Sequence, residues 1–223
     1  MAVILVLCTF AVFIAVDAIL SRKRAPQTET ATAKPSEAPD VSQEVIDGFH
    51  VPAELRYHPG HSWAYRERKN VIRVGIDEFA SKLAGKIDKI ELPKPGHWIR
   101  QGQRAWALFR GEEKAEMLSP VEGEVVEVNP ELIHNPALIH QDPYGKGWLF
   151  TVFAPDEESV LRNLLPAEVV GGWMRETVSR LYAKQPALAG AVAADGGRPA
   201  DDLAAAIPGA SWKELTAEFF LTR

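Results

Sequence analysis

The stretch RGEEKAEMLSPVEGEVVEVN, from Arg110 to Asn129, contains two short strand-like runs and two turns. The runs KAEML and GEVVEV have the alternating or β-branched composition of short strands. RGEE precedes the first run and PVEG separates the two runs, and both are rich in turn-forming residues. Gly111 suits a left-handed turn position, so we expect the bend at Gly111 and Glu112. The stretch therefore predicts a β-hairpin that bends at Gly111 and Glu112. Lys114 is expected on the strand that follows the bend.

Further strand-like runs precede this stretch. SWAYRE, VIRVGI, KIDKIEL and RAWALFR are separated by turn material such as RKN, PKPG and RQG. This spacing predicts a compact, mainly β sandwich or barrel, which we place at residues 51–155. One internal helix interrupts the strands. Its body is EFASKLA, with Asp77 as the N-cap and Gly85 as the stop.

The pattern changes after Pro155. DEESVLRNLL and AEVVGGWMRETVSRLYAK carry apolar residues at spacings of three and four, which predicts helices. Ser211 and Glu214 form a capping box before LTAEFFL. We therefore expect a helical extension over residues 156–223. Its Trp and Phe side chains would either pack on the β domain or form a docking surface.

The chain begins with an apolar run, AVILVLCTFAVFIAVDAIL, over residues 2–20. As a helix this run would span roughly 28 Å, close to the hydrocarbon thickness of a bilayer. SRKR follows directly, and positive residues beside a span stay on the cytoplasmic side. We therefore predict a single-pass transmembrane anchor at residues 1–21, in the cell membrane, with the globular domain on the cytoplasmic side. A cleaved signal peptide is the alternative, but no positive residue precedes the run.

A polar segment follows the anchor. APQTETATAKPSEAPDVSQE is rich in Pro, Ala, Thr, Ser and Glu and has almost no large apolar residue. Such a segment cannot bury enough surface to fold. We therefore expect a flexible linker over residues 22–50.

Composition and motifs exclude several function classes. The net charge is −5 and the basic cluster at residues 22–24 is short, so no nucleic-acid partner is expected. The single cysteine, Cys8, excludes an intramolecular disulfide. No Gly-x-Ser-x-Gly, paired histidines at helical spacing or phosphate loop indicates an enzyme, so no catalytic residue is expected. His50, His58 and His61 have no further ligand beside them in the sequence, so we interpret them as capping or surface histidines and expect no metal.

Several segments, in this order, resemble the H protein of the glycine cleavage system. The resemblance covers about residues 55–153. It implies a barrel-sandwich hybrid, or hammerhead, with a hairpin that carries a lipoyl-lysine. It also implies a carrier, not an enzyme, which brings an aminomethyl group from the glycine decarboxylase to the aminomethyltransferase and is reoxidised by dihydrolipoamide dehydrogenase. The segments are YHPGHSW (57–63), VGIDEFASKLAGKI (74–87), IELPKPG (90–96), SPVEGEVVEVN (119–129) and NPALIHQDPYGKGWLF (135–150).

The hairpin tip departs from this family. Counting back from the next Ser-Pro turn places Glu112 where the family has its lipoyl lysine, and a carboxylate cannot form the lipoyl amide. Lys114 is the only lysine nearby, and its two-residue offset keeps it on the same strand face. We expect Lys114 to be a solvated strand lysine beside an acidic neighbour, and we expect no cofactor, with lipoate on Lys114 as the alternative. The tip would then be acidic, with Glu112, Glu113 and Glu116 close together.

Two functions are compatible with these features. As a carrier, a membrane-tethered H protein would shuttle an aminomethyl group through Lys114. As a binding module, the H-like domain would dock a partner without covalent chemistry, in the manner of a subunit of a membrane redox complex. The sequence favours a membrane-tethered, unlipoylated H-protein-like chain. Its expected partners are proteins of the glycine cleavage system or of such a redox complex.

Overall fold

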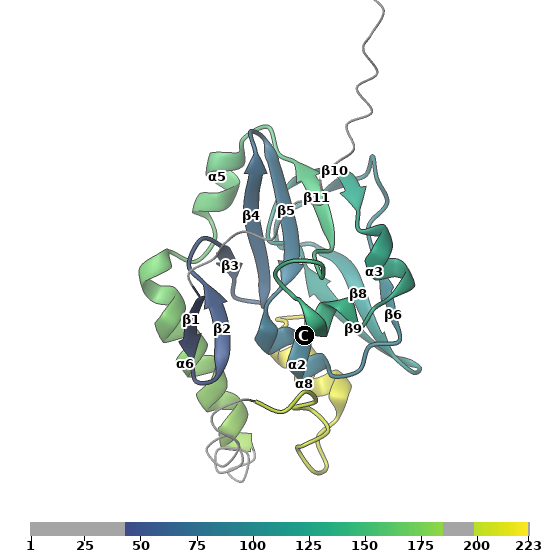
Figure 1. Cartoon of the computed structure of the whole chain (residues 1–223), viewed down its shortest axis with the longest axis vertical. Helices are drawn as coiled ribbons and strands as arrows, with labels where there is room; N and C mark the ends of the chain where they lie inside the picture. Colours follow the sequence, from purple (N-terminus) through teal and green to yellow (C-terminus); the bar gives the residue numbers. More distant parts are fainter. Residues whose placement is uncertain (1–42, 185–198, 223) are drawn as a thin grey trace, which may run out of the picture. The chain divides into compact units, whose positions relative to one another are not determined.

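The computed structural model describes residues 43–184 and 199–222, and strands dominate its first part (Figure 1). The strands are β1 (Gln43–Ile46), β2 (Phe49–Pro52), β3 (Arg56–His58), β4 (Ser62–Arg68), β5 (Val71–Ile76), β6 (Lys89–Glu91), β7 (Trp98–Ile99), β8 (Arg104–Arg110), β9 (Glu113–Leu118), β10 (Gly123–Val128) and β11 (Phe150–Phe153). The helices are α2 (Glu78–Ala84), α3 (Pro130–His134), α4 (Leu138–Gln141), α5 (Glu157–Arg162), α6 (Ala167–Lys184) and α8 (Trp212–Phe219). The prediction of a mainly β domain followed by helices is confirmed.

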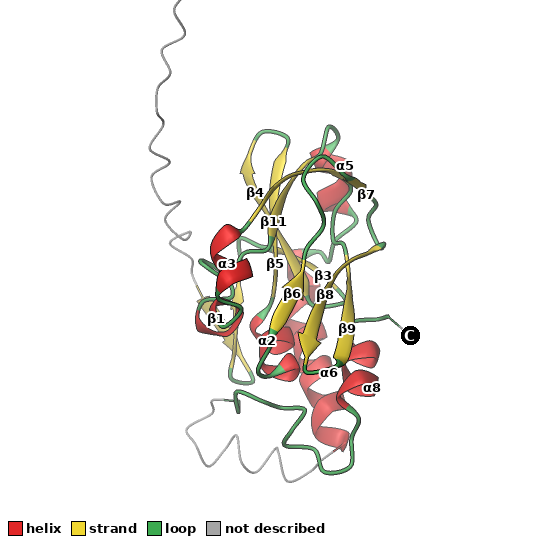
Figure 2. Ribbon diagram, turned by 90° about the vertical axis from the view of Figure 1, so that its right-hand side faces the viewer, coloured by secondary structure: helices red, strands yellow, loops and turns green. Residues whose placement is uncertain are grey.

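The strands form three antiparallel sheets in the described part of the chain. Their orders are β1-β2, β3-β4-β5-β11-β10-β7 and β6-β8-β9. The six-stranded and three-stranded sheets contribute to one apolar core, in which the rings of Trp106 and Phe150 meet edge to face with centroids 5.3 Å apart. Figure 2 shows the three-stranded sheet beside the larger one, with α2, α6 and α8 gathered at one end.

Helix α2 begins and ends where the sequence predicts. The Asp77 carboxylate accepts a hydrogen bond from the Ala80 backbone N–H at 2.8 Å, which is N-capping. Gly85 follows the helix with φ of +65°, a conformation that favours glycine. A Cβ at Gly85 would lie 2.5 Å from the Asp202 side chain, so this position also needs glycine for space.

Two predictions within the β domain are wrong. The linker cannot extend to residue 50, because β1 and β2 form a hairpin with Ile46 and Phe49 buried. Asp47 and Gly48 both have positive φ, as an Asp-Gly type I′ turn requires, so a sequence signal was present. The domain also holds more than one internal helix. The Asn129 side chain caps α3, which has proline at its first position, and α4 follows.

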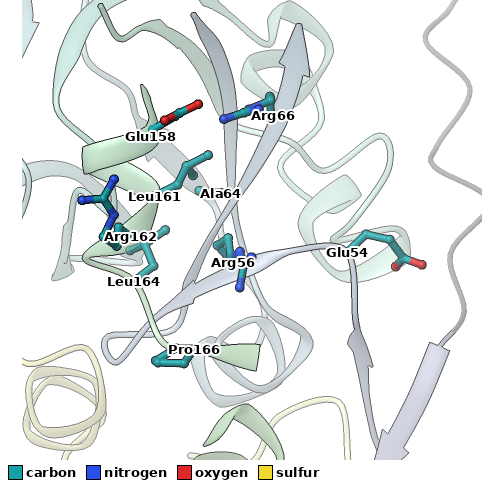
Figure 3. Close-up of a pocket in the computed structure, with 9 residues that line it drawn as sticks. All are labelled: Glu54, Arg56, Ala64, Arg66, Glu158, Leu161, Arg162, Leu164 and Pro166. Carbon is teal, nitrogen blue, oxygen red and sulfur yellow. The ribbon is translucent and has the colours of Figure 1, made fainter. Parts of the chain in front are cut away.

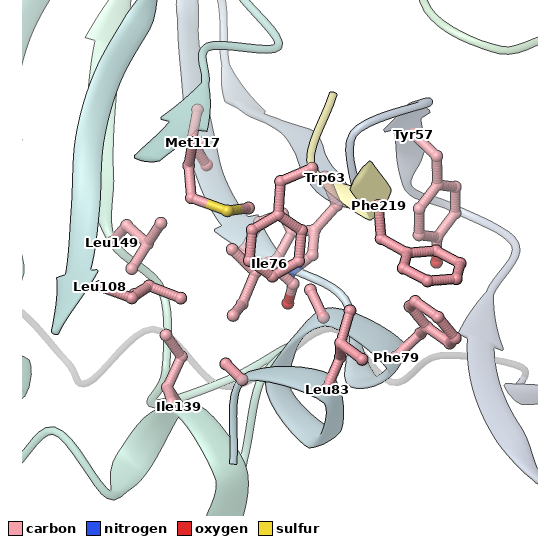
Figure 4. Close-up of a cluster of buried hydrophobic side chains, with 14 of the residues drawn as sticks. Tyr57, Trp63, Ile76, Phe79, Leu83, Leu108, Met117, Ile139, Leu149 and Phe219 are labelled. Atoms are coloured by element: carbon pink, nitrogen blue, oxygen red, sulfur yellow. The ribbon is translucent and has the colours of Figure 1, made fainter. Parts of the chain in front are cut away.

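The C-terminal extension packs on the β domain, one of the two predicted alternatives. The Trp212 indole N–H donates to the Ala84 carbonyl oxygen at 2.8 Å. The Phe219 ring lies 5.3 Å from the Phe79 ring, inside the same buried cluster (Figure 4). The predicted capping box is present in part, since the Ser211 hydroxyl accepts from the Glu214 backbone N–H at 3.3 Å. Helix α8 is therefore a component of the core.

The membrane prediction concerns a different part of the chain. No helix among the described residues is long and apolar enough to cross a bilayer. The predicted anchor at residues 1–21 and most of the predicted linker lie outside the described residues.

Two histidines are held in poorly solvated positions. Burial lowers the pKa of His140, whose Nδ1 lies 3.3 Å from the Ser81 hydroxyl. Burial, with a smaller contribution from His61, also lowers the pKa of His58, whose Nδ1 accepts a hydrogen bond from the Gly60 N–H. Both imidazoles are therefore neutral in the native protein near neutral pH.

Replacement of Phe219 by alanine should destabilise the domain strongly. The buried ring is lost from a close-packed site, which typically lowers the free energy of unfolding by about 3–5 kcal/mol. Phe153→Ala is the matched control, because that ring is 41% exposed and its loss should matter much less. Urea unfolding of both variants tests this expectation, and equal losses would contradict a core role for α8.

Stability should fall as the solution is acidified from about pH 7.5 to about pH 5.5. Since the folded pKa values of His58 and His140 lie below the unfolded value of about 6.5, the unfolded chain binds more protons in this range. The contribution is fully present above the unfolded pKa and is lost as pH falls toward the folded pKa. Urea unfolding of a His58→Asn, His140→Asn variant should show a flatter pH dependence. An unchanged slope would refute the assignment.

Candidate functional site

The β8–β9 hairpin ends in a two-residue turn made of Gly111 and Glu112. Arg110 pairs directly with Glu113, which leaves the two residues between them as the loop. Gly111 has φ of +57° and Glu112 does not have positive φ, as in a type II′ turn. The Gly111 N–H donates to the Asp88 carboxylate at 2.8 Å, which fixes the turn against the neighbouring loop. The predicted bend is confirmed, and the exposed Glu112 side chain stands at the tip.

Lys114 lies on the return strand and not in the turn. It pairs with Phe109 of β8, and its Nζ is 5.9 Å from the centroid of that ring. The same Nζ lies 3.5 Å from a Glu116 carboxylate oxygen. Lys89 approaches the Phe109 ring at 5.0 Å from the neighbouring strand β6, so two ammonium groups share one aromatic ring. The prediction of a strand lysine beside an acidic neighbour is confirmed.

The predicted acidic tip is smaller than expected. Glu116 lies opposite Ala107, away from the turn, and Arg104 Nη1 is 3.1 Å from its carboxylate. With Lys114 on its other side, Glu116 is neutralised by two cations. Of the three glutamates, Glu112 and Glu113 remain at the tip, where the Asp88 carboxylate also contacts the turn. The strand register separates Glu116 from Glu112 and Glu113, and this register could not be deduced from the sequence.

The C-terminal extension braces the hairpin beside its turn. Arg110, the last residue of β8, makes two contacts with the Asp202 carboxylate, at 3.1 and 2.9 Å. This bidentate geometry is the stronger form of an arginine–carboxylate pair. The Leu203 N–H donates to the Lys82 carbonyl oxygen at 2.9 Å, which ties the same segment to α2. Sequence reasoning missed this brace, because its partners lie about ninety residues apart.

His61 is fully buried, contrary to the expectation of a capping or surface histidine. Its Nδ1 lies 2.8 Å from the Asp77 carboxylate, the same carboxylate that caps α2. Its ring stacks between Phe79, at 4.5 Å, and Trp173 of α6, at 4.7 Å. The extension therefore helps to enclose the His61 side chain, which has no solvent exposure. The burial could not be deduced locally, because Trp173 is distant in sequence.

The histidines do not form a metal site. His50 Nδ1 lies 2.8 Å from Glu78, while His58 and His61 have different partners of their own. Across residues 43–184 and 199–222, no group of three or more potential metal ligands occurs.

The hairpin tip does not fit the lipoyl group that the resemblance implies. Amide attachment needs an amine, and the tip presents the Glu112 carboxylate. The lysine nearest to the tip in the sequence, Lys114, is about half exposed, and its amine is directed along the outer face of the sheet toward Phe109 and Glu116. The arrangement can present charged side chains to a partner, but it does not present an amine at the turn.

Comparisons with known proteins agree with this fold. A family described as glycine cleavage H-protein matches residues 55–176, more than half of the chain. The glycine cleavage system H protein of Aeromonas salmonicida is 39% identical over 119 residues, which cover 53% of this chain and 92% of that protein. The corresponding protein of Escherichia coli O7:K1 is 37% identical over 118 residues, covering 53% and 91%.

A solved structure is also similar. The crystal structure of a glycine cleavage system H protein from Mycobacterium marinum is 28% identical, covers 55% of this chain and 97% of that chain, and gives a TM-score of 0.48. The family match, together with relatives matched over nearly their whole length, identifies the chain as a member of the glycine cleavage H-protein family.

Proposed function

We propose that this chain is an unlipoylated binding protein of the H-protein family, tethered to a membrane and docking a protein partner through its folded domain. Membership of a carrier family, not of an enzyme family, is the starting point. The single observation that carries the proposal is the exposed carboxylate of Glu112 at the tip of a two-residue turn. A domain that keeps the hairpin but has no amine at its tip retains a binding surface and lacks the attachment point.

The packing of β9 supports this proposal, because it opposes a shift of Lys114 into the turn. Such a shift needs β9 to slide by two residues, which would open a loop over residues 111–114. Met117 would then stand opposite Leu108, where Ala115 now packs. Both Ala115 and Met117 are buried, so a methionine at the alanine position would overpack the core. The register is therefore fixed by the interior.

The membrane tether in this proposal rests on the sequence of the first residues. The apolar run at 2–20 is long enough to span a bilayer, and SRKR beside it favours retention of the domain on the cytoplasmic side of the cell membrane. A carrier that visits several soluble enzymes has no evident need of an anchor. A docking subunit held near a membrane partner does.

The proposed partner is a protein that recognises the H-protein fold. The relatives are named for the glycine cleavage system, so its proteins are one source of such a partner. A membrane redox complex is the other, since it would explain the anchor. In either case the interaction is non-covalent, and this chain contributes a surface and not a reacting group.

Co-expression with lipoate-attaching enzymes should leave the wild-type chain unmodified, whereas a Glu112→Lys variant should gain a lipoyl group. The substitution places an amine at the exposed tip without changing the register. Intact-mass measurement checks both results, with the Escherichia coli H protein lipoylated in the same cells as a positive control. A lipoyl increment on the wild type that disappears in Lys114→Arg would establish the carrier function instead.

Cell fractionation should find the full chain in the membrane pellet, resistant to an alkaline carbonate wash. Deletion of residues 1–21 removes the apolar run and should move the protein to the soluble fraction. Immunoblotting of the two fractions is the measurement. Recovery of the full chain among soluble proteins would contradict the tether, while leaving the absence of lipoylation untouched.

A further inference from the structure

A cleft of about 570 Å³ lies between β3, β4 and the segment that includes α5, away from the hairpin tip (Figure 3). Its size is within the usual range of ligand pockets. Three arginines from three different elements line it, namely Arg56 of β3, Arg66 of β4 and Arg162 at the end of α5. Because the sheet and the helix hold these residues separately, the cluster depends on the tertiary fold.

The charges in the cleft are unevenly distributed. Arg66 is partly compensated, since its guanidinium lies 3.4 Å from the Glu157 carboxylate and Glu158 lines the same end (Figure 3). Neither Arg56 nor Arg162 makes an ion pair with any residue that the structure describes. Glu54 is directed away from these arginines (Figure 3). The end of the cleft at Arg56 and Arg162 is therefore electropositive, although the whole chain is acidic.

The floor of the cleft is apolar. It is formed by aliphatic side chains next to the two unpaired guanidinium groups (Figure 3). Guanidinium groups bind carboxylates through paired N–H donors, and an aliphatic floor accepts an apolar neighbour of that carboxylate. The floor residues are Ala64, Leu161, Leu164 and Pro166.

We propose that this cleft is a docking site for an acidic peptide segment of a partner protein, in which a carboxylate side chain lies beside an aliphatic one. One carboxylate of the segment binds Arg56 and another binds Arg162, and the aliphatic side chain packs on Leu161 and Leu164. This inference rests on the proposed function as a binding protein and supplies the chemistry of its partner. The acidic hairpin tip cannot play this role, because its charge has the wrong sign.

The test uses the full chain in detergent micelles and a fluorescein-labelled peptide that alternates glutamate with leucine. Fluorescence anisotropy should detect binding that weakens with added salt, as expected for exposed charges. An Arg56→Ser, Arg162→Ser variant should bind at least about tenfold more weakly. Arg100→Ser, an exposed arginine outside the cleft, is the matched control and should bind like the wild type.

Charge reversal separates docking from loss of structure. An Arg56→Glu, Arg162→Glu variant with unchanged thermal unfolding should prefer a lysine–leucine peptide over the glutamate–leucine one. Failure of the wild type to bind the acidic peptide, or equal binding by the double serine variant, would overturn the proposal. Neither result bears on lipoylation, so the mass measurement on the hairpin distinguishes failure of this site from failure of the proposed function.

Discussion

The register of the β8–β9 hairpin is the constraint on which the candidate site depends. Pairing of Arg110 with Glu113 closes a turn of only two residues, and the side chains alternate between the two faces from this turn to the pair of Trp106 and Met117. Leu108 and Met117 are consequently directed into the core, while Lys114 lies on the outer face beside Phe109. The residue left for the tip is a glutamate. The interior of the domain thus decides which functional group the hairpin presents.

The C-terminal extension makes this chain different from relatives of ordinary length. The family match ends at residue 176, inside α6, yet Trp212 and Phe219 are buried in the common core. The Arg110–Asp202 pair ties the same extension to the hairpin beside its turn. Trp173, which lies within the matched residues, stacks on the buried His61 ring. The extension therefore stabilises the hairpin that carries the site, and a binding protein benefits from such a rigid surface.

Local signals in the sequence predicted local structure well. Asp77 and Ser211 cap helices because each needs only a backbone N–H three residues away. The Asp47-Gly48 turn was equally local and was missed, because the polar composition around it favoured a linker. The burial of His61 and the pairing of Glu116 could not be predicted, since both depend on residues that only the tertiary fold brings close. The turn residues predicted the bend at Gly111 and Glu112, and the strand register confirms it.

The most direct test of the central claim is a tryptic map of the protein purified from the cells that naturally produce it. Trypsin cleaves after an unmodified Lys114, whereas an amide-linked lipoyl group removes the charge that the protease recognises. The account predicts a peptide that begins at Ala115 and ends at Lys146. A peptide that instead begins at Gly111, retains Lys114 uncleaved and carries the mass of a lipoyl group would contradict it.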